Sequence, residues 1–318
     1  MSDYRIRPFE PTEAEYEAVV ALQNLVEPNR PNPVASWRHW DESRDPERGF
    51  QRWLVEKDDQ LVAQGWLMRT GPTSDKFRFD THLHPACQGR GLTARFYRYM
   101  VDICLAQQPS AIITRIGENE TQKLHWLTKN GFQIVMRYPV SRLEVANFAL
   151  APYADLLAKL AAEGIEIVSL IDLPERDPDW QRQVYELDYV LMCDVPLPEP
   201  YEKRPLPQFI HEEFEGPTFL PGGWLVALEG DQYVGLIALV KFGEDVQTLD
   251  IAITGVIRSH RRRGIATALK ARSIEFAQDI GAKFIETNNE EHNPMYQLNL
   301  QLGFQPQPAD LDMEKVLR

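Results

Sequence analysis

The pattern of apolar and polar positions in this chain runs through the same series of elements twice. In each half a short strand leads into a helix, a hairpin of apolar strands, a further strand and a long helix. Apolar spacings of three, four and seven residues along each long helix predict that one face is buried. The residues at these positions are Leu92, Phe96, Met100 and Ile103 in the first half and Ile265, Leu269, Phe276 and Ile280 in the second.

The expected elements fall at corresponding places in the two halves. Strands are predicted at 4–8, 77–83 and 111–116, and again at 165–170, 248–257 and 283–287. Helices are predicted near 12–26 and 177–191, and apolar hairpins near 52–68 and 223–241. A short helix, a Gly-Phe pair and a last strand close each half, so the order of elements predicts a mixed α/β fold. Residues 196–207 contain five prolines and are expected to form an irregular surface loop.

Recurring residue pairs indicate that a whole domain has been duplicated. The Asp-Gln pair at 59–60 returns at 231–232, and the Gly-Phe pair at 131–132 returns at 303–304, at the same spacing. A period this long excludes solenoid repeats, which run about 20–50 residues. We therefore expect two domains, residues 1–147 and residues 148–318, with a linker helix at 151–163 that Gly164 ends.

Composition narrows the classes of partner. A net charge of -13 argues against general binding of nucleic acid or of anionic membranes. The first residues show no signal-peptide pattern, and no apolar run approaches the length of a membrane span. Cys87, Cys104 and Cys193 are scattered without metal-ligand spacing, which suits a reduced cytosol and predicts no metal site. We expect a cytoplasmic protein, and its oligomeric state is left open.

Two glycine loops carry the chemistry. Residues 261–266 (RRRGIA) lie between an apolar strand and the second long helix, and residues 88–93 (QGRGLT) occupy the matching place in the first half. Such a loop gathers backbone N–H groups and a helix N-terminus around one anion. A P-loop is excluded because neither copy has Gly-Lys-Ser/Thr. Residues 89–94 match a dinucleotide fingerprint, but they follow the fourth strand instead of the first.

These segments resemble the GNAT N-acetyltransferase superfamily, once per half. The matches are residues 256–266, Asn293 and residues 302–304 in the second half, and residues 83–91 in the first. The tandem layout is similar to that of mycothiol synthase and its relatives. The resemblance implies two GNAT-like domains, each a mostly antiparallel twisted sheet flanked by helices, and acetyl-CoA as the acyl donor.

The resemblance also assigns the cofactor contacts. The loop amides would hold the pyrophosphate, and the strand before each loop would pair its backbone with pantetheine. The residues implied are Val256, Ile257, Arg258, Arg261, Arg262, Arg263, Gly264, Ile265, Ala266 and Asn293 in the second half, and Leu83, His84, Gln88, Gly89, Arg90, Gly91, Leu92 and Thr93 in the first.

The catalytic candidates lie in the second half. Family members commonly place a tyrosine four residues before the Gly-Phe glycine, where this chain has Asn299 and, in the first half, Leu127. Tyr296 lies one helical turn before Asn299 and is a possible source of a phenol. Asp250 and Glu286, on strands beside the loop, are candidate bases, although a solvent-facing strand carboxylate is an equally good interpretation.

The sequence therefore predicts an acetyl-CoA-dependent N-acetyltransferase that acts on the amine of an unidentified small molecule. Catalysis is expected in the second half, which keeps Ala266 and Tyr296 near its loop. The alternative is a non-catalytic acyl-CoA sensor or assembly module, which the missing tyrosine of both halves favours. Asn293 followed by Pro294 also predicts the N-terminus of a helix that Gly303 ends.

Overall fold

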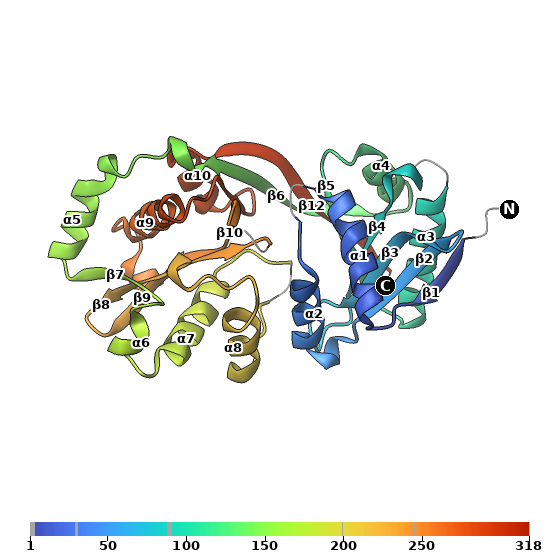
Figure 1. The fold of residues 1–318 in the computed structure, drawn as a ribbon, viewed down its shortest axis with the longest axis horizontal. Helices are drawn as coiled ribbons and strands as arrows, with labels where there is room; N and C mark the ends of the chain where they lie inside the picture. Colours follow the sequence, from blue (N-terminus) through green and yellow to red (C-terminus); the bar gives the residue numbers. More distant parts are fainter. Residues whose placement is uncertain (1–3, 29–30, 88–90, 199, 244–245, 318) are drawn as a thin grey trace. The chain divides into compact units, whose positions relative to one another are not determined.

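The computed structural model describes residues 4–28, 31–87, 91–198, 200–243 and 246–317. The chain divides into two compact units (Figure 1). Unit 1 comprises residues 1–137 and 309–318, and unit 2 comprises residues 138–308. Within the described ranges, no helix combines the length and the apolar character that crossing a membrane requires.

Unit 1 is a sheet with the strand order β1-β2-β3-β4-β5-β12, antiparallel except for the parallel pair β4 and β5. Helices flank the sheet, which agrees with the predicted mixed α/β fold. The elements up to the middle of the chain are β1 (Arg5–Pro8), α1 (Glu13–Val26), α2 (Val34–Ser43), β2 (Gln51–Lys57), β3 (Gln60–Arg69), β4 (Phe77–Leu83), α3 (Leu92–Ala106), β5 (Ala111–Gly117), α4 (Thr121–Lys129) and β6 (Gln133–Glu144).

Unit 2 repeats this plan with the order β6-β11-β10-β9-β8-β7, and β10 and β11 are its parallel pair. Its elements, with the last strand of the chain, are α5 (Ala154–Ala162), β7 (Ile165–Ser169), α6 (Leu173–Arg176), α7 (Trp180–Met192), α8 (Leu206–Phe214), β8 (Trp224–Glu229), β9 (Gln232–Lys241), β10 (Thr248–Val256), α9 (Ile265–Asp279), β11 (Phe284–Asn288), α10 (Pro294–Gln301) and β12 (Gln305–Val316). Short 3-10 turns are η1 (Pro46–Arg48), η2 (Pro85–Cys87), η3 (Val145–Asn147), η4 (Ala151–Tyr153), η5 (Pro221–Gly223) and η6 (Arg258–His260).

The helix predicted at 151–163 is present as α5, inside unit 2, and Gly164 follows it in the left-handed conformation, with φ at 81°. The proline-rich stretch at 196–207 is not irregular to its end, because α8 begins at Leu206 with Pro207 in its first turn. Proline is tolerated there since the N–H groups of a first turn have no intrahelical acceptor. Helix α2 was not predicted.

The sheet of unit 2 is covered on both faces. Helices α9 and α10 lie against one face, and α7 and α8 lie against the other (Figure 1). The α9 side buries a large cluster that includes Leu269 and Ile274, and the α7 side buries Val184, Leu187 and Trp224. The centre of the sheet is therefore closed to water on both sides, and polar groups placed there need partners.

The last strand of each half of the sequence pairs with a strand of the other half. The end of β6 pairs with β11 at Val140–Asn288 to Glu144–Phe284, and β12 pairs with β5 from Asp310–Gly117 to Val316–Ala111. The compact units consequently differ from the sequence halves 1–147 and 148–318 by an exchanged strand. Duplicated domains permit this exchange because each final strand meets an equivalent sheet edge in either half.

A buried ion-pair cluster holds β12 in unit 1. Asp312 is fully buried and accepts hydrogen bonds from Arg115 Nε at 2.9 Å and Arg78 Nη2 at 3.1 Å. Burial by itself would raise the pKa of Asp312, but Arg115 and Arg78 together hold it below its usual value. The carboxylate therefore stays charged at neutral pH. Without it, the charges of Arg78 and Arg115 would be left without this partner at a poorly solvated position.

Replacing Asp312 with asparagine tests this attachment. Breaking a buried ion pair costs about 3–5 kcal/mol, so Asp312→Asn should lower the free energy of unfolding by about 3 kcal/mol in urea titrations at neutral pH. Because the folded pKa lies below the unfolded one, the wild-type contribution is present above about pH 4 and is lost as the pH falls through the folded pKa.

Glu314 on the same strand provides the control. It lies 3.0 Å from Lys76 in a less buried pair, and Glu314→Gln should cost about 0–1 kcal/mol. Equal, small losses for the two variants would contradict the role given to Asp312.

Candidate functional site

The parallel strand pair in each sheet separates after a few residues. Among the described residues, β10 pairs with β11 over Thr248–Phe284 to Asp250–Glu286, and then continues with β9 alone. A bulge follows at once, between Ile251 and Ile253. In unit 1, β4 and β5 are paired at Phe77–Ile112 and Arg78–Ile113 before they separate. Each glycine loop follows the strand that has lost its parallel neighbour.

The glycine loop of unit 2 presents a row of free backbone donors. Arg262 has a φ of 66° and Gly264 a φ of 92°, so the chain turns sharply into the N-terminus of α9. Among the described residues, the N–H groups of Arg262, Arg263, Gly264 and Ile265 have no hydrogen-bond acceptor. A non-glycine residue in the left-handed region is strained, and such residues cluster at ligand sites.

Space at the loop is also restricted by α5. The φ of 92° requires glycine at position 264, and a Cβ added there would lie 2.6 Å from Leu156 Cδ1, so the end of that side chain would have to move.

Most of the loop arginines are held by carboxylates. Arg258 Nε donates to Asp194 Oδ1 at 3.1 Å, and Arg261 also pairs with Asp194. Arg263 donates to Glu229 at 3.0 Å and to Glu163 at 3.2 Å. Hydrogen bonds from Arg258 and then Arg261 lower the pKa of Asp194, so the pairs stay charged at neutral pH.

Arg262 differs from its neighbours. Within the described part of the chain it has no hydrogen-bond or ion-pair partner. It is therefore the loop cation whose charge no carboxylate offsets, and it extends from the most strained backbone position of the loop. The sequence alone predicts the same role, phosphate binding, for all four arginines, and the structure separates Arg262 from the other three.

The corresponding loop of unit 1 is described in part. The predicted contacts Gln88, Gly89 and Arg90 lie outside the described residues. Gly91 has a φ of 76° and precedes α3, as Gly264 precedes α9. Leu83 ends β4, and the backbone N of His84 donates to Val62 O at 2.8 Å.

Two of the candidate catalytic residues lie side by side where β10 and β11 are last paired. Asp250 is directly opposite Glu286 in the register. Glu286 is buried and lies 3.6 Å from Arg142 Nη1 on β6. The structure thus brings the two predicted carboxylates together at the start of the gap.

Helix α10 carries the other candidates. Asn293 is its N-cap and accepts a hydrogen bond from Met295 N at 3.0 Å, and Gly303 follows with a φ of 95°, so the predicted ends of this helix are confirmed. Asn299 is fully buried and donates to Asn289 Oδ1 at 2.7 Å, while its own Oδ1 has no partner. Tyr296 is only partly buried. An unpaired buried acceptor is costly, so a ligand that donates a hydrogen bond to Asn299 Oδ1 would remove this cost.

Sequence reasoning missed a buried lysine in unit 2. Lys270 on α9 is 1% exposed and near Asp250, and its Nζ lies 6.0 Å from the ring of Phe304. Burial, opposed by the charge of Asp250, lowers the pKa of Lys270 to about 7. Its position in the repeat could have indicated the burial. Lys270 lies six residues after the glycine N-cap of α9, and Tyr97, six residues after the glycine N-cap of α3, is also fully buried.

Unit 1 has a polar cluster of its own in the gap between β4 and β5. Lys123 Nζ lies 3.4 Å from Asp80, and His82 Nε2 lies 3.8 Å from Asp80 and 3.5 Å from Glu27. Burial opposes the charge of Asp80, but Lys123 and His82 hold its pKa below the usual value.

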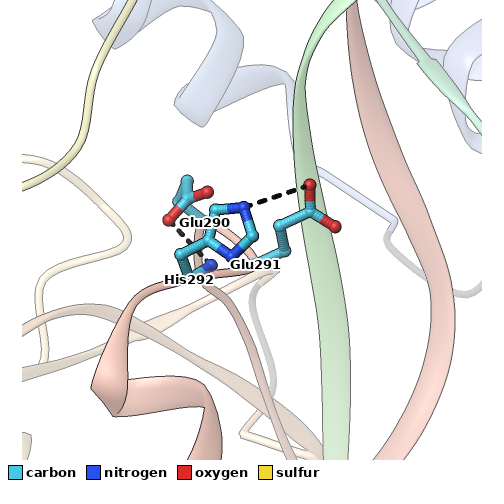
Figure 2. Close-up of side chains that lie close together, drawn as sticks. All are labelled: Glu290, Glu291 and His292. Atoms are coloured by element: carbon cyan, nitrogen blue, oxygen red, sulfur yellow. Dashed lines mark hydrogen bonds and ion pairs between the residues drawn. The ribbon is translucent and has the colours of Figure 1, made fainter.

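An acidic turn borders the gap in unit 2. Figure 2 shows Glu290, Glu291 and His292 close together between β11 and α10, with ligand atoms within 4.8 Å of one another. The His292 side chain is 86% exposed, its Nε2 lies 3.9 Å from Glu291, and its backbone N donates to Glu290 at 2.9 Å. These contacts account for the cluster, and we assign no metal to it.

Known proteins resemble this chain in part of its sequence and in its fold. Residues 182–304 match the acetyltransferase (GNAT) family. No curated protein sequence was found to match the chain. A tandem GNAT protein from the clavulanic acid biosynthesis pathway shares the fold, with a TM-score of 0.78 and 17% identity over 99% of this chain and 98% of the other.

Two further solved structures share the fold. A GCN5-related N-acetyltransferase from Sphaerobacter thermophilus has a TM-score of 0.70 and 17% identity, over 99% of this chain and 96% of its own. An acetyltransferase from Pyrococcus horikoshii, described as putative, has a TM-score of 0.55 and 16% identity, over 99% of this chain and 90% of its own.

The difference between Arg262 and its neighbours can be measured with inorganic pyrophosphate as the probe. A charge-assisted hydrogen bond contributes about 1.5–3 kcal/mol, so Arg262→Ala should weaken binding at least about tenfold in calorimetric titrations. Arg258→Ala removes a cation that is 80% exposed and already paired with Asp194, and it should leave the affinity nearly unchanged. Equal effects of the two substitutions would show that the arginines act as one undivided positive patch.

Proposed function

We propose that the chain is a tandem member of the GNAT superfamily of acyltransferases and that unit 2 transfers an acetyl group from acetyl-CoA to the amine of a small molecule. The observation that carries this proposal is the row of acceptor-free N–H groups from Arg262 to Ile265 at the start of α9. A helix N-terminus with free donors binds a phosphate group favourably.

The residues of unit 2 fit the cofactor. We assign the pyrophosphate to the loop amides and Arg262, while the remaining loop arginines fix the loop through Asp194, Glu229 and Glu163. The edge of β10 beyond Asp250 is assigned to the pantetheine amides because β11 no longer occupies it. The predicted contacts Val256 and Ile257 end this edge with partners of their own, since Val256 O accepts from Arg261 Nε and Ile257 N donates to Val234 O. The remaining predicted contacts, Ile265, Ala266 and Asn293, border the same site.

The first half keeps an equivalent assignment as a CoA-binding or structural unit. Its contacts are Leu83, His84, Gly91, Leu92 and Thr93, with Gln88, Gly89 and Arg90 outside the described residues. Lys123 and Asp80 lie in its gap as an ion pair, and Leu127 fills the tyrosine position with a core side chain. We therefore place the chemistry in unit 2.

Four residues of unit 2 supply the polar groups for the reaction. Acetyl-CoA brings an activated thioester when it is bound. Asp250 or Glu286 accepts the proton that the attacking amine loses, since both carboxylates lie where the strands separate. The unpaired Asn299 Oδ1 accepts an N–H from a bound ligand. Tyr296, one turn earlier on α10 and partly exposed, lines the side from which an acceptor enters.

A panel of small amines with acetyl-CoA tests the proposal through release of the CoA thiol. At least one amine should be acetylated, and Gly264→Ala should abolish both turnover and CoA binding, since the added Cβ meets Leu156 at 2.6 Å. Gly281→Ala is the matched control, because Gly281 has a similar φ of 77° and open space around it.

Tyr296→Phe distinguishes an acetyltransferase that uses this phenol from a protein that only binds acyl-CoA. An enzyme that uses this phenol should lose turnover while keeping its affinity for CoA. If CoA binds and no amine in a broad panel releases thiol, the chain is a non-catalytic acyl-CoA sensor or assembly module instead. The position of Asn299, in place of the usual tyrosine, favours that second function.

A further inference from the structure

Lys270 is a buried lysine with a charged neighbour, Asp250, whose charge favours the protonated form. Its side chain is 1% exposed, and its ammonium makes no hydrogen bond or ion pair with any described residue. The hydrogen bond that Ser273 Oγ donates to Lys270, at 2.9 Å, goes to the backbone carbonyl and does not involve the ammonium. The ring of Phe304, 6.0 Å from Nζ, is the aromatic group nearest to it.

The surroundings place this ammonium beside the gap in the sheet. Asp250, the charged residue that acts on Lys270, is the last residue of β10 paired with β11. Phe304 donates its backbone N–H to Asn299 O at 3.1 Å, so it belongs to the segment that carries the position of the missing tyrosine. Lys270 thus approaches from α9, on the face of the sheet that also carries α10 (Figure 1).

An unpaired ammonium in a protein core opposes folding. An apolar side chain of similar length would fill the same space without the cost of removing a charge from water. Lysines kept under this penalty are concentrated at functional sites, where burial adjusts their proton affinity. A ligand that interacts with the nitrogen of Lys270 would explain why a lysine is kept at this buried position.

We propose that Lys270 is the proton donor to the sulfur of CoA when unit 2 transfers an acetyl group. The inference rests on the proposed function and deepens it, by assigning to a lysine of α9 the step for which Asn299 offers no ionisable group. Position on the α9 side of the gap, full burial and the absence of a competing hydrogen bond support this assignment.

Acetyl transfer moves two protons, one from the amine and one to the sulfur. The amine nitrogen of the acceptor forms a bond to the acetyl carbon, and the surplus N–H proton passes to Asp250 or Glu286. As the carbon–sulfur bond breaks, the electron pair stays on sulfur, and Lys270 transfers one ammonium proton to it. Lys270 is then neutral and one carboxylate is protonated, so return of that proton through water restores both groups.

The proton affinities suit this direction of transfer. Burial lowers the pKa of Lys270 to about 7, whereas an ordinary thiol has a pKa of about 8.5. The other titratable groups around the gap are Glu286 with Arg142 and, on α10, Tyr296. A donor that is partly protonated at neutral pH and more acidic than the group it protonates meets the requirement for general acid catalysis.

Titration of the CoA thiol on the protein tests the contact with Lys270. In wild type, Lys270 can take up the proton of the bound thiol as an ion pair forms, so bound CoA should form its thiolate, followed by ultraviolet absorbance, at lower pH than free CoA does. Lys270→Met should raise the apparent pKa of the bound thiol by about one unit, a tenfold change in the ionisation constant, with CoA affinity unchanged. With an amine found to be a substrate, the same variant should lower kcat about 100-fold without changing KM for acetyl-CoA.

Lys283→Met is the control, because Lys283 is an exposed lysine of the same unit. It should behave as wild type in both measurements. If CoA does not bind at unit 2, the proposed function itself fails. If CoA binds and its thiol ionises at the same pH in wild type and both variants, the role of Lys270 is overturned while the proposed function stands.

A second readout uses the wild-type protein and does not depend on how the variant folds. Nuclear magnetic resonance of labelled lysine should show the pKa of Lys270 rising when CoA binds, because a thiolate nearby stabilises the ammonium. Desulfo-CoA, which lacks the sulfur, should leave that pKa where it is in the free protein. The same shift with both ligands would contradict a contact between Lys270 and the sulfur.

Discussion

The early separation of β10 from β11 is the constraint on which the site depends. Backbone groups in the middle of a covered sheet normally pair with a neighbouring strand, and beyond Asp250 this neighbour is gone on one side. The strand then enters a loop whose own N–H groups have no acceptors, at the N-terminus of α9. The result is two stretches of free backbone, the edge of β10 beyond Asp250 and the amides from Arg262 to Ile265, that a ligand with amide and phosphate groups can complete.

Polar side chains collect around the same gap for the same reason. The Asn299 Oδ1 atom and the Lys270 ammonium are buried without hydrogen-bond partners, while Asp250 and Glu286 mark the end of the paired region. Each uncompensated group lowers the stability of unit 2, and their concentration in one place is typical of a functional site. The loop arginines act differently, since Asp194, Glu229 and Glu163 hold three of the four in a fixed arrangement.

Much of this could be predicted from the sequence. Apolar periodicity located α3 and α9, the repeated glycine loops located the turns that precede these helices, and Asn293 with Pro294 located the start of α10. These features are local, so their signals lie within a few residues. The exchange of the last strands could not be predicted, because the same alternating pattern fits the edge of either sheet.

Long-range pairing and burial explain the other differences. Asp194 is distant in sequence from the arginines that it binds, so the loop cations looked equally free. A lysine within an amphipathic helix usually faces water, and only the packing of α9 on the sheet shows that Lys270 does not. In unit 1 the ion pair of Lys123 and Asp80 likewise joins residues from separate elements.

Hydrogen exchange of the backbone amides, with and without acetyl-CoA, measures whether the loop amides bind the cofactor. Acetyl-CoA should slow exchange at Arg262, Arg263, Gly264 and Ile265, because these free N–H groups become donors to the pyrophosphate. Binding of acetyl-CoA that leaves exchange at these four amides unchanged would contradict this role of the loop.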